Sequence, residues 1–335
     1  MTQKDKIALV RALLAELDKV ISGYKDIKLK IVYALLADGH VLLESVPGLA
    51  KTTLIAALQS AIGNSRKARI QMTPDLKPGD IIGTLVFNPT TGKFETRKGP
   101  IIGKNLVLVD EINRGTPKTQ SALLEAMQER KVSLADEEYV MEDPFLVLAT
   151  QNPIEQEGTY PLPEAQLDRF GFKLILDYVS REDELQILEN TGVHGRGAQE
   201  VITPVITTEQ VVELRKDILA NVRVERTALE YIVDLVRTTR PSDANFKKYV
   251  GNELSGKIQV GASPRAQIWL RRFAQVRAFL QGRDHVLPED VKFVAPDVLR
   301  HRIILNDMAL LDGYTTDQAI KVVLNAVPVV EPKTK

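Results

Sequence analysis

The chain has 335 residues, enough for two domains of ordinary size, and 44% of them are hydrophobic while 26% are charged. This composition is typical of a folded globular protein and excludes an intrinsically disordered chain. The formal net charge is zero and each half of the chain is close to neutral, which argues against a basic nucleic-acid-binding domain. The absence of cysteine excludes disulfides, thiol catalysis and cysteine-ligated zinc.

No stretch of sequence approaches the ~20 consecutive apolar residues that cross a bilayer. The first twenty residues are interrupted by charges and contain no apolar signal-peptide core. We therefore expect a cytoplasmic protein without a membrane span. The four histidines are scattered along the chain and show no metal-ligand spacing, so a histidine metal site is not expected.

In chain order, apolar residues at helical spacing first predict two helices, over residues 7–21 and 27–37. Short apolar runs then predict five strands, at His40–Leu43, Lys67–Gln71, Leu106–Val109, Phe145–Ala149 and Phe172–Leu176. Helices are predicted between them at Lys51–Ala61 and Lys118–Glu129, the second with Thr116 as its cap and Pro117 as its first residue. This alternation indicates a mostly parallel α/β sheet with both faces covered.

Two segments depart from the alternation and are predicted as hairpins, at Ile81–Arg97 and Lys131–Met141. After about residue 177 the strand pattern stops and helices are predicted at Arg181–Asn190, Thr208–Leu219, Arg226–Thr239, Pro264–Gln281 and Pro288–Arg300. We expect an α/β domain over residues 1–190, a glycine-containing linker over 191–207 and an all-helical domain over 208–335.

A strand, a turn containing proline and glycine, and a helix that opens with Lys-Thr follow one another within residues 40–53. A phosphate-binding loop requires this order, because backbone N–H groups of the turn and the helix N-terminus point at the anion. Lys51 would neutralise charge on the outer phosphates, and the Thr52 hydroxyl would bind magnesium. Such a loop normally has glycine where Ser45 stands, and an ordinary strand–turn–helix junction is the alternative interpretation.

Asp110 and Glu111 follow the apolar run of residues 106–109. Asp110 would hold the magnesium ion, directly or through water, and Glu111 would polarise the attacking water. A lone Asp-Glu pair is usually a solvated turn. Here, however, two complementary half-sites each lie at the carboxyl end of a predicted strand, which is where open α/β sheets bind their ligands.

Five motifs, in order along nearly the whole chain, together resemble those of the MoxR family of AAA+ ATPases. They are Val46–Thr52 (VPGLAKT), Val109–Arg114 (VDEINR), Ala149–Pro153 (ATQNP), Tyr160–Phe170 (YPLPEAQLDRF) and Gly261–Ala266 (GASPRA). The resemblance implies a P-loop NTPase (AAA+) parallel-sheet core with hairpin inserts, followed by a helical lid domain. Ala50 agrees with the family pattern, whereas Ser45 departs from it.

The resemblance also assigns nucleotide contacts. In the phosphate-binding loop, the nucleotide contacts that it assigns are Val46, Pro47, Gly48, Leu49, Ala50, Lys51, Thr52 and Thr53. Ile21 and Gly23 are its candidates for a pocket around the adenine base, and Thr52 and Asp110 are its magnesium ligands. The two hairpins would lie at the surface or pore of a ring, where partners could bind.

The resemblance also assigns catalytic roles to four residues: Glu111, Asn152, Arg169 and Arg265. Asn152 would position the attacking water, Arg169 would reach the γ-phosphate bound to a neighbouring subunit, and Arg265 would be the second sensor, on the lid. From the residues alone, Asn152 could instead begin a turn, and Arg169 could pair with Asp168 on the surface. For Arg265, a Ser-Pro helix start directly before it independently predicts a place at the beginning of a helix.

By resemblance the protein is a magnesium-dependent ATPase that assembles into a ring, expected to be a hexamer, with ATP and Mg²⁺ as cofactors. Its work would be chaperone-like: remodelling a client protein complex or loading it with metal, together with a partner containing a von Willebrand A domain. Two alternatives remain. One is a nucleotide-gated scaffold with little hydrolysis, which the serine at position 45 favours. The other is a chelatase-like or DNA-acting motor, against which the balanced charge argues in the case of DNA.

Overall fold

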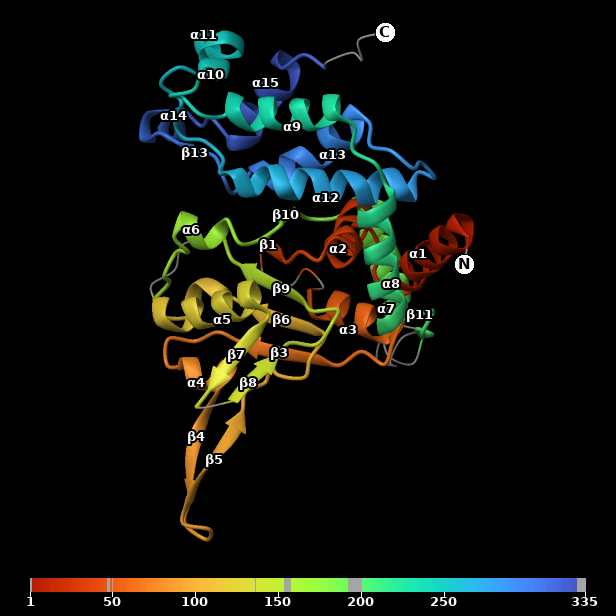
Figure 1. Ribbon diagram of the computed structural model, residues 1–335, viewed down its shortest axis with the longest axis vertical. Helices are drawn as coiled ribbons and strands as arrows, with labels where there is room; N and C mark the ends of the chain where they lie inside the picture. Colours follow the sequence, from red (N-terminus) through yellow and green to blue (C-terminus); the bar gives the residue numbers. More distant parts are fainter. Residues whose placement is uncertain are drawn as a thin grey trace. The chain divides into compact units, whose positions relative to one another are not determined.

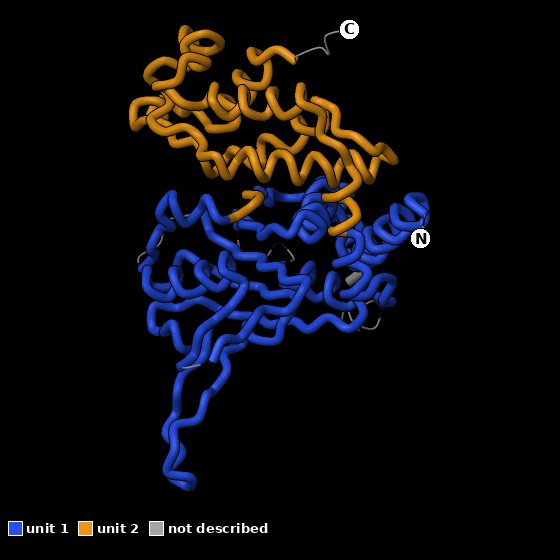
Figure 2. The backbone as a smooth tube through the Cα atoms, viewed as in Figure 1, with its two compact units in different colours: residues 1–169, 174–214 blue, residues 170–173, 215–335 orange. Residues whose placement is uncertain are grey.

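The computed structural model describes residues 2–46, 49, 51–135, 137–153, 158–191 and 201–329. The chain forms two compact units (Figure 2). Unit 1 comprises residues 1–169 and 174–214, and unit 2 comprises residues 170–173 and 215–335. Among the helices of the described residues, none has the length and apolar character needed to cross a membrane.

A five-stranded sheet forms the centre of unit 1 (Figure 1). Its strand order is β10-β1-β9-β6-β3, with β1 at Val41–Ser45, β3 at Lys67–Gln71, β6 at Leu106–Asp110, β9 at Leu146–Gln151 and β10 at Phe172–Leu176. The pairs β1–β9, β6–β9 and β3–β6 are parallel. Strand β6 is buried along its whole length, which explains its unbroken apolar run. The predicted parallel core is confirmed.

The predicted helical segments of unit 1 are present. They are α1 (Gln3–Asp18), α2 (Lys25–Ala37), α3 (Lys51–Ala61), α5 (Pro117–Glu129), α7 (Arg181–Thr191) and the first half of α8 (Thr208–Asn221). Three short segments were not predicted: α4 (Pro78–Ile82), the 3₁₀ turn η1 (Ile112–Arg114) and α6 (Glu164–Leu167). Thr116 caps α5, because its hydroxyl accepts a hydrogen bond from the N–H of Thr119. The first helix begins and ends earlier than predicted: it runs from Gln3 to Asp18, and the chain then turns through positive φ angles at Gly23 and Tyr24.

Both predicted hairpins are present. Strands β4 (Gly83–Asn88) and β5 (Lys93–Lys98) form an antiparallel ribbon that extends away from the sheet (Figure 1), and β7 (Lys131–Leu134) pairs with β8 (Glu137–Val140). The first ribbon begins at Gly83, where φ is 109°. A Cβ at that position would lie 2.6 Å from the carbonyl oxygen of Arg97, so only glycine fits there.

One short pairing falls inside the segment expected to be a linker. Strand β11 (Ile206–Thr207) pairs in parallel with β2 (Ile62–Gly63). Just before it, Thr203 donates its N–H to Glu16 at 3.0 Å, and Val205 donates to the carbonyl of Ala61 at 3.0 Å. The described part of this segment is therefore fastened to unit 1. Two-residue strands leave no periodicity in the sequence, which is why the pairing was not predicted.

The described residues of unit 2 are mainly helical. It contains α9 (Arg226–Thr238), α10 (Ala244–Tyr249), α11 (Gly251–Leu254), α12 (Pro264–Leu280), α13 (Pro288–Leu299), α14 (Asp307–Leu311) and α15 (Thr316–Ala326), with β12 (Ile258–Val260) antiparallel to β13 (Ile304–Leu305). Helix α12 packs against both α9 and α13. The three long predicted helices are confirmed, whereas the short ladder and the helices α10, α11, α14 and α15 were not predicted.

Candidate active site

Three parallel strands bring the predicted site residues to one edge of the sheet. Strand β1 ends at Ser45, β6 ends at Asp110, and β9 ends at Gln151, directly before Asn152. The register pairs Glu44 with Gln151, so the ends of β1 and β9 lie side by side. Asn152 is half-buried. The carboxyl ends of central parallel strands are the place where this type of sheet binds ligands.

Lys51 is the first residue of α3 and is half-buried. Burial lowers the pKa of its ammonium group below the ordinary value, while the negative charges of Asp110 and Glu111 raise it. These opposing effects show that the lysine and both carboxylates, predicted from motifs far apart in the sequence, lie within electrostatic reach of one another.

The other residues of the predicted loop are only partly described. Val46, Leu49 and Thr53 are half-buried, and Thr52, the second residue of α3, is exposed. Pro47, Gly48 and Ala50 lie outside the described residues.

Ser45, which replaces the usual glycine, is buried at the end of β1. Its hydroxyl donates a hydrogen bond to the carbonyl of Val46 at 3.1 Å. Ser45 is not one of the residues with a positive φ angle. The chain therefore leaves β1 through a conformation that an L-residue adopts without strain, and the physical need for glycine at this position is absent.

Asp110 is buried, and its Oδ2 accepts a hydrogen bond from Nε of Arg69 at 2.7 Å. Arg69 lies on the neighbouring strand β3 and is mostly exposed. Sequence analysis missed this arginine. Because side chains alternate along a strand, residues 69 and 71 lie on the same face of β3, and that spacing is the signal that could have identified them.

The backbone of Glu111 is held in a left-handed conformation, with φ of 53°. Its N–H donates to the hydroxyl of the buried Thr150 at 2.9 Å. Its Oε2 accepts hydrogen bonds from Nε2 of Gln71 at 3.2 Å and from Nη1 of Arg114 at 3.0 Å. A non-glycine residue in this region costs about 1–3 kcal/mol and is found preferentially at functional sites.

The predicted base-pocket residues lie in the turn between α1 and α2. Ile21 is buried, and its carbonyl accepts a hydrogen bond from Nζ of Lys28 at 2.8 Å. Gly23 has φ of 72°, and a Cβ there would lie 3.0 Å from side-chain atoms of both Val179 and Asp183. Tyr24, which sequence analysis did not select, donates its hydroxyl to the carbonyl of Asp177 at 2.9 Å. The turn is thus packed against the segment that leads into α7.

Arg169 follows the short helix α6 and is half-buried. Its N–H donates to the carbonyl of Gln166 at 3.2 Å. Its Nε is buried and has no hydrogen-bond acceptor among the described residues. Buried polar groups nearly always have a hydrogen-bond partner, so this nitrogen is an exception that needs an explanation.

Arg265 belongs to unit 2, where it is exposed in the first turn of α12. The hydroxyl of Ser263 accepts a hydrogen bond from its N–H at 3.1 Å, and Pro264 is the first helical residue, as predicted. The preceding loop is anchored within unit 2: the N–H of Ala262 donates to the Thr239 hydroxyl at 2.9 Å.

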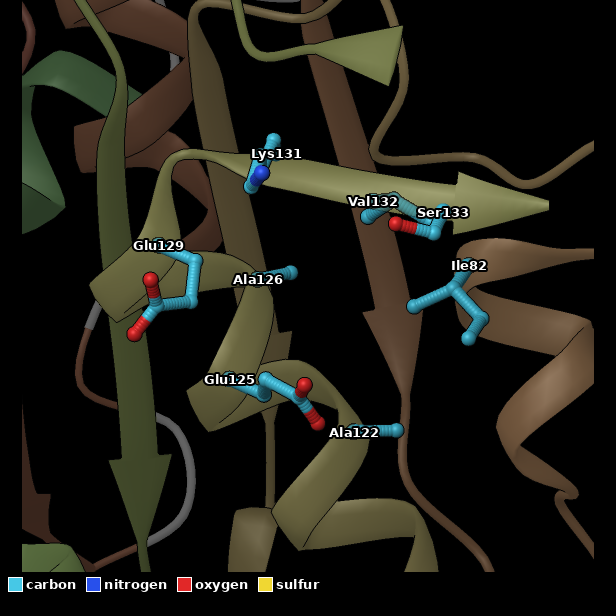
Figure 3. A pocket seen from close by; sticks show the side chains of 8 residues that line it. All are labelled: Ile82, Ala122, Glu125, Ala126, Glu129, Lys131, Val132 and Ser133. Carbon is cyan, nitrogen blue, oxygen red and sulfur yellow. The ribbon is translucent and has the colours of Figure 1, made fainter. Parts of the chain in front are cut away.

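A pocket of about 210 Å³ lies elsewhere in unit 1, between α5, the end of α4 and strand β7 (Figure 3). Its charged residues are Glu125, Glu129 and Lys131, and its walls are Ile82, Ala122, Ala126, Val132 and Ser133. It contains none of the predicted site residues. Two carboxylates beside one ammonium group do not favour a polyphosphate, so this pocket is not the nucleotide site.

The fold and site together define a class of protein. A parallel sheet with its P-loop strand next to β9, a lysine at the start of the following helix and two acidic residues at the end of β6 define a nucleotide-hydrolysing P-loop protein of the AAA+ type. Comparison with known families agrees. Residues 40–172 match the ATPase family associated with various cellular activities (AAA), and residues 254–322 match the AAA lid domain.

Known relatives narrow the class to a family. The chain is 42% identical to Chaperone MoxR1 of Mycobacterium tuberculosis, over 93% of this chain and 80% of that protein. It is 43% identical to the protein YeaC of Bacillus subtilis, over 98% of this chain and 97% of that protein. A crystal structure of a putative ATPase from Cytophaga hutchinsonii, 42% identical, superimposes with a TM-score of 0.90 and covers 98% of this chain and 97% of its own. The chain belongs to the MoxR family of AAA+ ATPases.

Proposed function

We propose that this AAA+ ATPase hydrolyses ATP with Mg²⁺ at a site completed by a second copy of the chain. The observation that carries the proposal is the electrostatic proximity of Lys51 to both Asp110 and Glu111 at one edge of the sheet. A lysine beside two carboxylates provides the charge needed for a triphosphate and the oxygen donors needed for its metal ion.

The donor set fits magnesium. Thr52 offers a hydroxyl oxygen at the start of α3, and the buried Asp110 offers a carboxylate oxygen at the end of β6. Hard oxygen donors are the ligands that Mg²⁺ prefers, and the bound ion would neutralise charge on the outer phosphates. Lys51 would bind those phosphates from the other side.

Glu111 is the proposed general base. Its carboxylate is oriented by Gln71 and Arg114, and its backbone is fixed by Thr150. From this position it would accept a proton from the attacking water. Asn152, at the end of the adjacent strand, would hold that water in line with the γ-phosphate.

Two arginines complete the proposed site. The buried Nε of Arg169 has no acceptor in the described part of its own chain, which supports a role in the site of a neighbouring copy. A guanidinium supplied in this way stabilises charge in the transition state and is worth roughly 10³–10⁵ in rate. Arg265, at the exposed start of α12, would contact the nucleotide from the lid, and Ile21 and Gly23 would lie beside the base.

We extend the proposal to assembly and biological role. An arginine supplied from each copy to the next makes a head-to-tail contact, which generates a ring when the rotation between copies closes, and a hexameric ring is the expected form. Loss of the γ-phosphate would then rotate lid against core. One relative is named a chaperone, which supports chaperone-like work. We propose that this work is remodelling of, or metal loading into, a client complex, together with a partner containing a von Willebrand A domain.

The test is Glu111→Gln, which keeps the shape of the side chain and removes its basicity. We expect nucleotide binding to remain while phosphate release falls by about 10²–10⁴. Glu125→Gln, an exposed change on α5, is the matched control and should leave both unchanged. Unchanged turnover in the Glu111 variant would refute the assigned base, and loss of binding would place the residue in nucleotide affinity instead.

A further inference from the structure

Four residues that directly follow Arg169 pack with unit 2 although they are distant from it in sequence. Residues 170–173, here called the strap, belong to unit 2, whereas Arg169 closes unit 1 on one side and Leu174 of β10 resumes it on the other. The rings of Phe172 and Phe273 are stacked, with centroids 3.6 Å apart, and Phe170 and Phe172 are both fully buried. The two aromatic side chains of the strap are therefore buried, and one of them stacks on α12 of unit 2.

Three consecutive residues after α13 hold the backbone of the strap. Arg302 donates from Nη2 to the carbonyl of Phe170 at 2.5 Å and from Nη1 to the carbonyl of Gly171 at 3.3 Å. His301 Nε2 lies 3.1 Å from the same Phe170 oxygen. Arg300 donates from Nη1 to the carbonyl of Lys173 at 2.8 Å. All of these acceptors are main-chain carbonyls, so the contacts fix the path of the chain whatever side chains the strap carries.

Arg300, His301 and Arg302, which contact the strap, are themselves held in place by neighbouring residues. Arg302 and His301 are buried, and Arg302 also donates to the carbonyl of Val298 at the end of α13. Arg300 is paired with Asp297 at 2.8 Å and with Asp317 at 2.8 Å. Hydrogen bonds from a charged donor that is buried are strong and costly to break. These contacts therefore hold the main chain at Phe170, Gly171 and Lys173 against the segment that follows α13, while Phe172 and Lys173 also begin strand β10.

We propose that Arg300, His301 and Arg302 are positioning residues for Arg169, so that unit 2 of one subunit sets the arginine that enters the site of its neighbour. Consecutive Cα atoms are ~3.8 Å apart, so fixing the main chain at Phe170 restricts where Arg169, the preceding residue, can lie. Movement of the lid of one subunit would in this way alter hydrolysis in the next. This inference rests on the proposed function of Arg169.

Arg302→Met tests the inference, since it removes both contacts to the strap and leaves Lys51, Asp110 and Glu111 of the same subunit intact. We expect kcat of the pure variant to fall about 10–100-fold, the loss typical of a small misplacement of a catalytic group, with KM for ATP unchanged. The decisive readout is mixing with Glu111→Gln subunits. Those subunits cannot hydrolyse ATP themselves, but their Arg169 is correctly held and would serve the intact sites of the Arg302→Met subunits.

If the inference is right, the mixture hydrolyses ATP faster than the sum of the two separate preparations. Absence of that recovery would mean that Arg302 acts on its own subunit, and the inference would be overturned. A mixture of Arg169→Ala and Glu111→Gln subunits distinguishes the positioning role of Arg302 from the shared site itself. Recovery with Arg169→Ala but not with Arg302→Met refutes the positioning role alone, whereas no recovery with Arg169→Ala refutes the shared site itself.

Two more conservative variants test whether a loss of activity comes from misfolding. Arg302→Lys keeps the charge and one donor, and His301→Gln keeps a donor for the Phe170 carbonyl. We expect both to give intermediate kcat values that recover on mixing, with thermal midpoints near that of the parent protein. Variants that fold normally and retain full kcat would also contradict the proposal.

Discussion

Nε of Arg69 and Oδ2 of Asp110 lie 2.7 Å apart, which pairs the proposed magnesium ligand with a cation from the neighbouring strand. The arginine is largely exposed while the carboxylate is buried. A metal ion bound to Asp110 as proposed would share this carboxylate with the arginine or displace it. We therefore expect the pair to influence how much Mg²⁺ the protein needs.

Arg69→Met should lower the magnesium concentration that gives half-maximal ATPase activity by two- to fivefold. The size follows from the modest strength of ion pairs with an exposed partner, at most about 1 kcal/mol. A magnesium titration at saturating ATP measures it. Arg66→Met is the matched control, because Arg66 pairs with Glu142 at 2.9 Å on the surface, away from the site residues. A higher magnesium requirement in the Arg69 variant would show that the arginine assists the site instead.

Ser45→Gly should not improve the enzyme. Because Ser45 already leaves β1 without a positive φ angle, glycine relieves no strain. It removes the hydrogen bond to Val46 and adds backbone freedom, so we expect a loss of about 0.5–1 kcal/mol in the free energy of unfolding. Urea titration and phosphate release measure the two effects. A large gain in kcat would instead support the scaffold interpretation, in which the serine disables the loop.

Gly261→Ala should disturb the loop that leads to Arg265. A Cβ at Gly261 would lie 2.4 Å from the carbonyl oxygen of Thr239, a main-chain atom that cannot turn aside. Overpacking of this kind costs about 1–3 kcal/mol. We expect a lower thermal midpoint together with weaker ATP binding.

The matched control for that substitution is Gly251→Ala, since a Cβ there would meet only the carbonyl oxygen of Phe246, at 3.6 Å. It lies in the first turn of α11, where alanine is tolerated. Equal destabilisation by the two substitutions would contradict the steric argument.

His301 should make the protein sensitive to mild acid. Burial holds the pKa of His301 well below its usual value, and the positive charge of Arg302 lowers it further. The charges of Lys173 and Arg300 also lower this pKa, whereas the hydrogen bond to the Phe170 carbonyl raises it. Below a pH of about 6.5 the unfolded chain binds a proton at this residue while the folded chain does not. The free energy of unfolding therefore falls as the pH drops through and below that value.

His301→Gln removes the titrating group and keeps a hydrogen-bond donor, so its stability should decline less steeply with acidification. Urea midpoints measured between about pH 7.5 and pH 5 give the comparison. The same slope in both proteins would exclude His301 as the source.

The strands and long helices could be predicted because their periodicity is local. Strands β3 and β10 and helix α3 have the predicted bounds, and every other predicted strand of the sheet is shifted by only one or two residues at either end. The grouping of Lys51 with Asp110 and Glu111 followed from a general rule about the carboxyl ends of parallel strands.

Contacts between residues that are far apart in the sequence could not be predicted. The pairing of Arg69 with Asp110 depends on which strands are neighbours, and the left-handed backbone of Glu111 depends on Thr150 from another strand. The strap was predicted only as the start of a strand. Its fixation by residues 300–302 joins segments about 130 residues apart, which no local pattern encodes.

The central claim is that ATP is cleaved between two copies of the chain, and the most direct measurement is turnover per subunit as a function of protein concentration. Phosphate release and molar mass would be recorded on the same samples, with ATP and Mg²⁺ present. We predict that turnover per subunit is low for the single chain and rises in step with the assembled mass. Turnover that stays constant while the protein remains a single chain, or no turnover in the assembled form, would contradict the account.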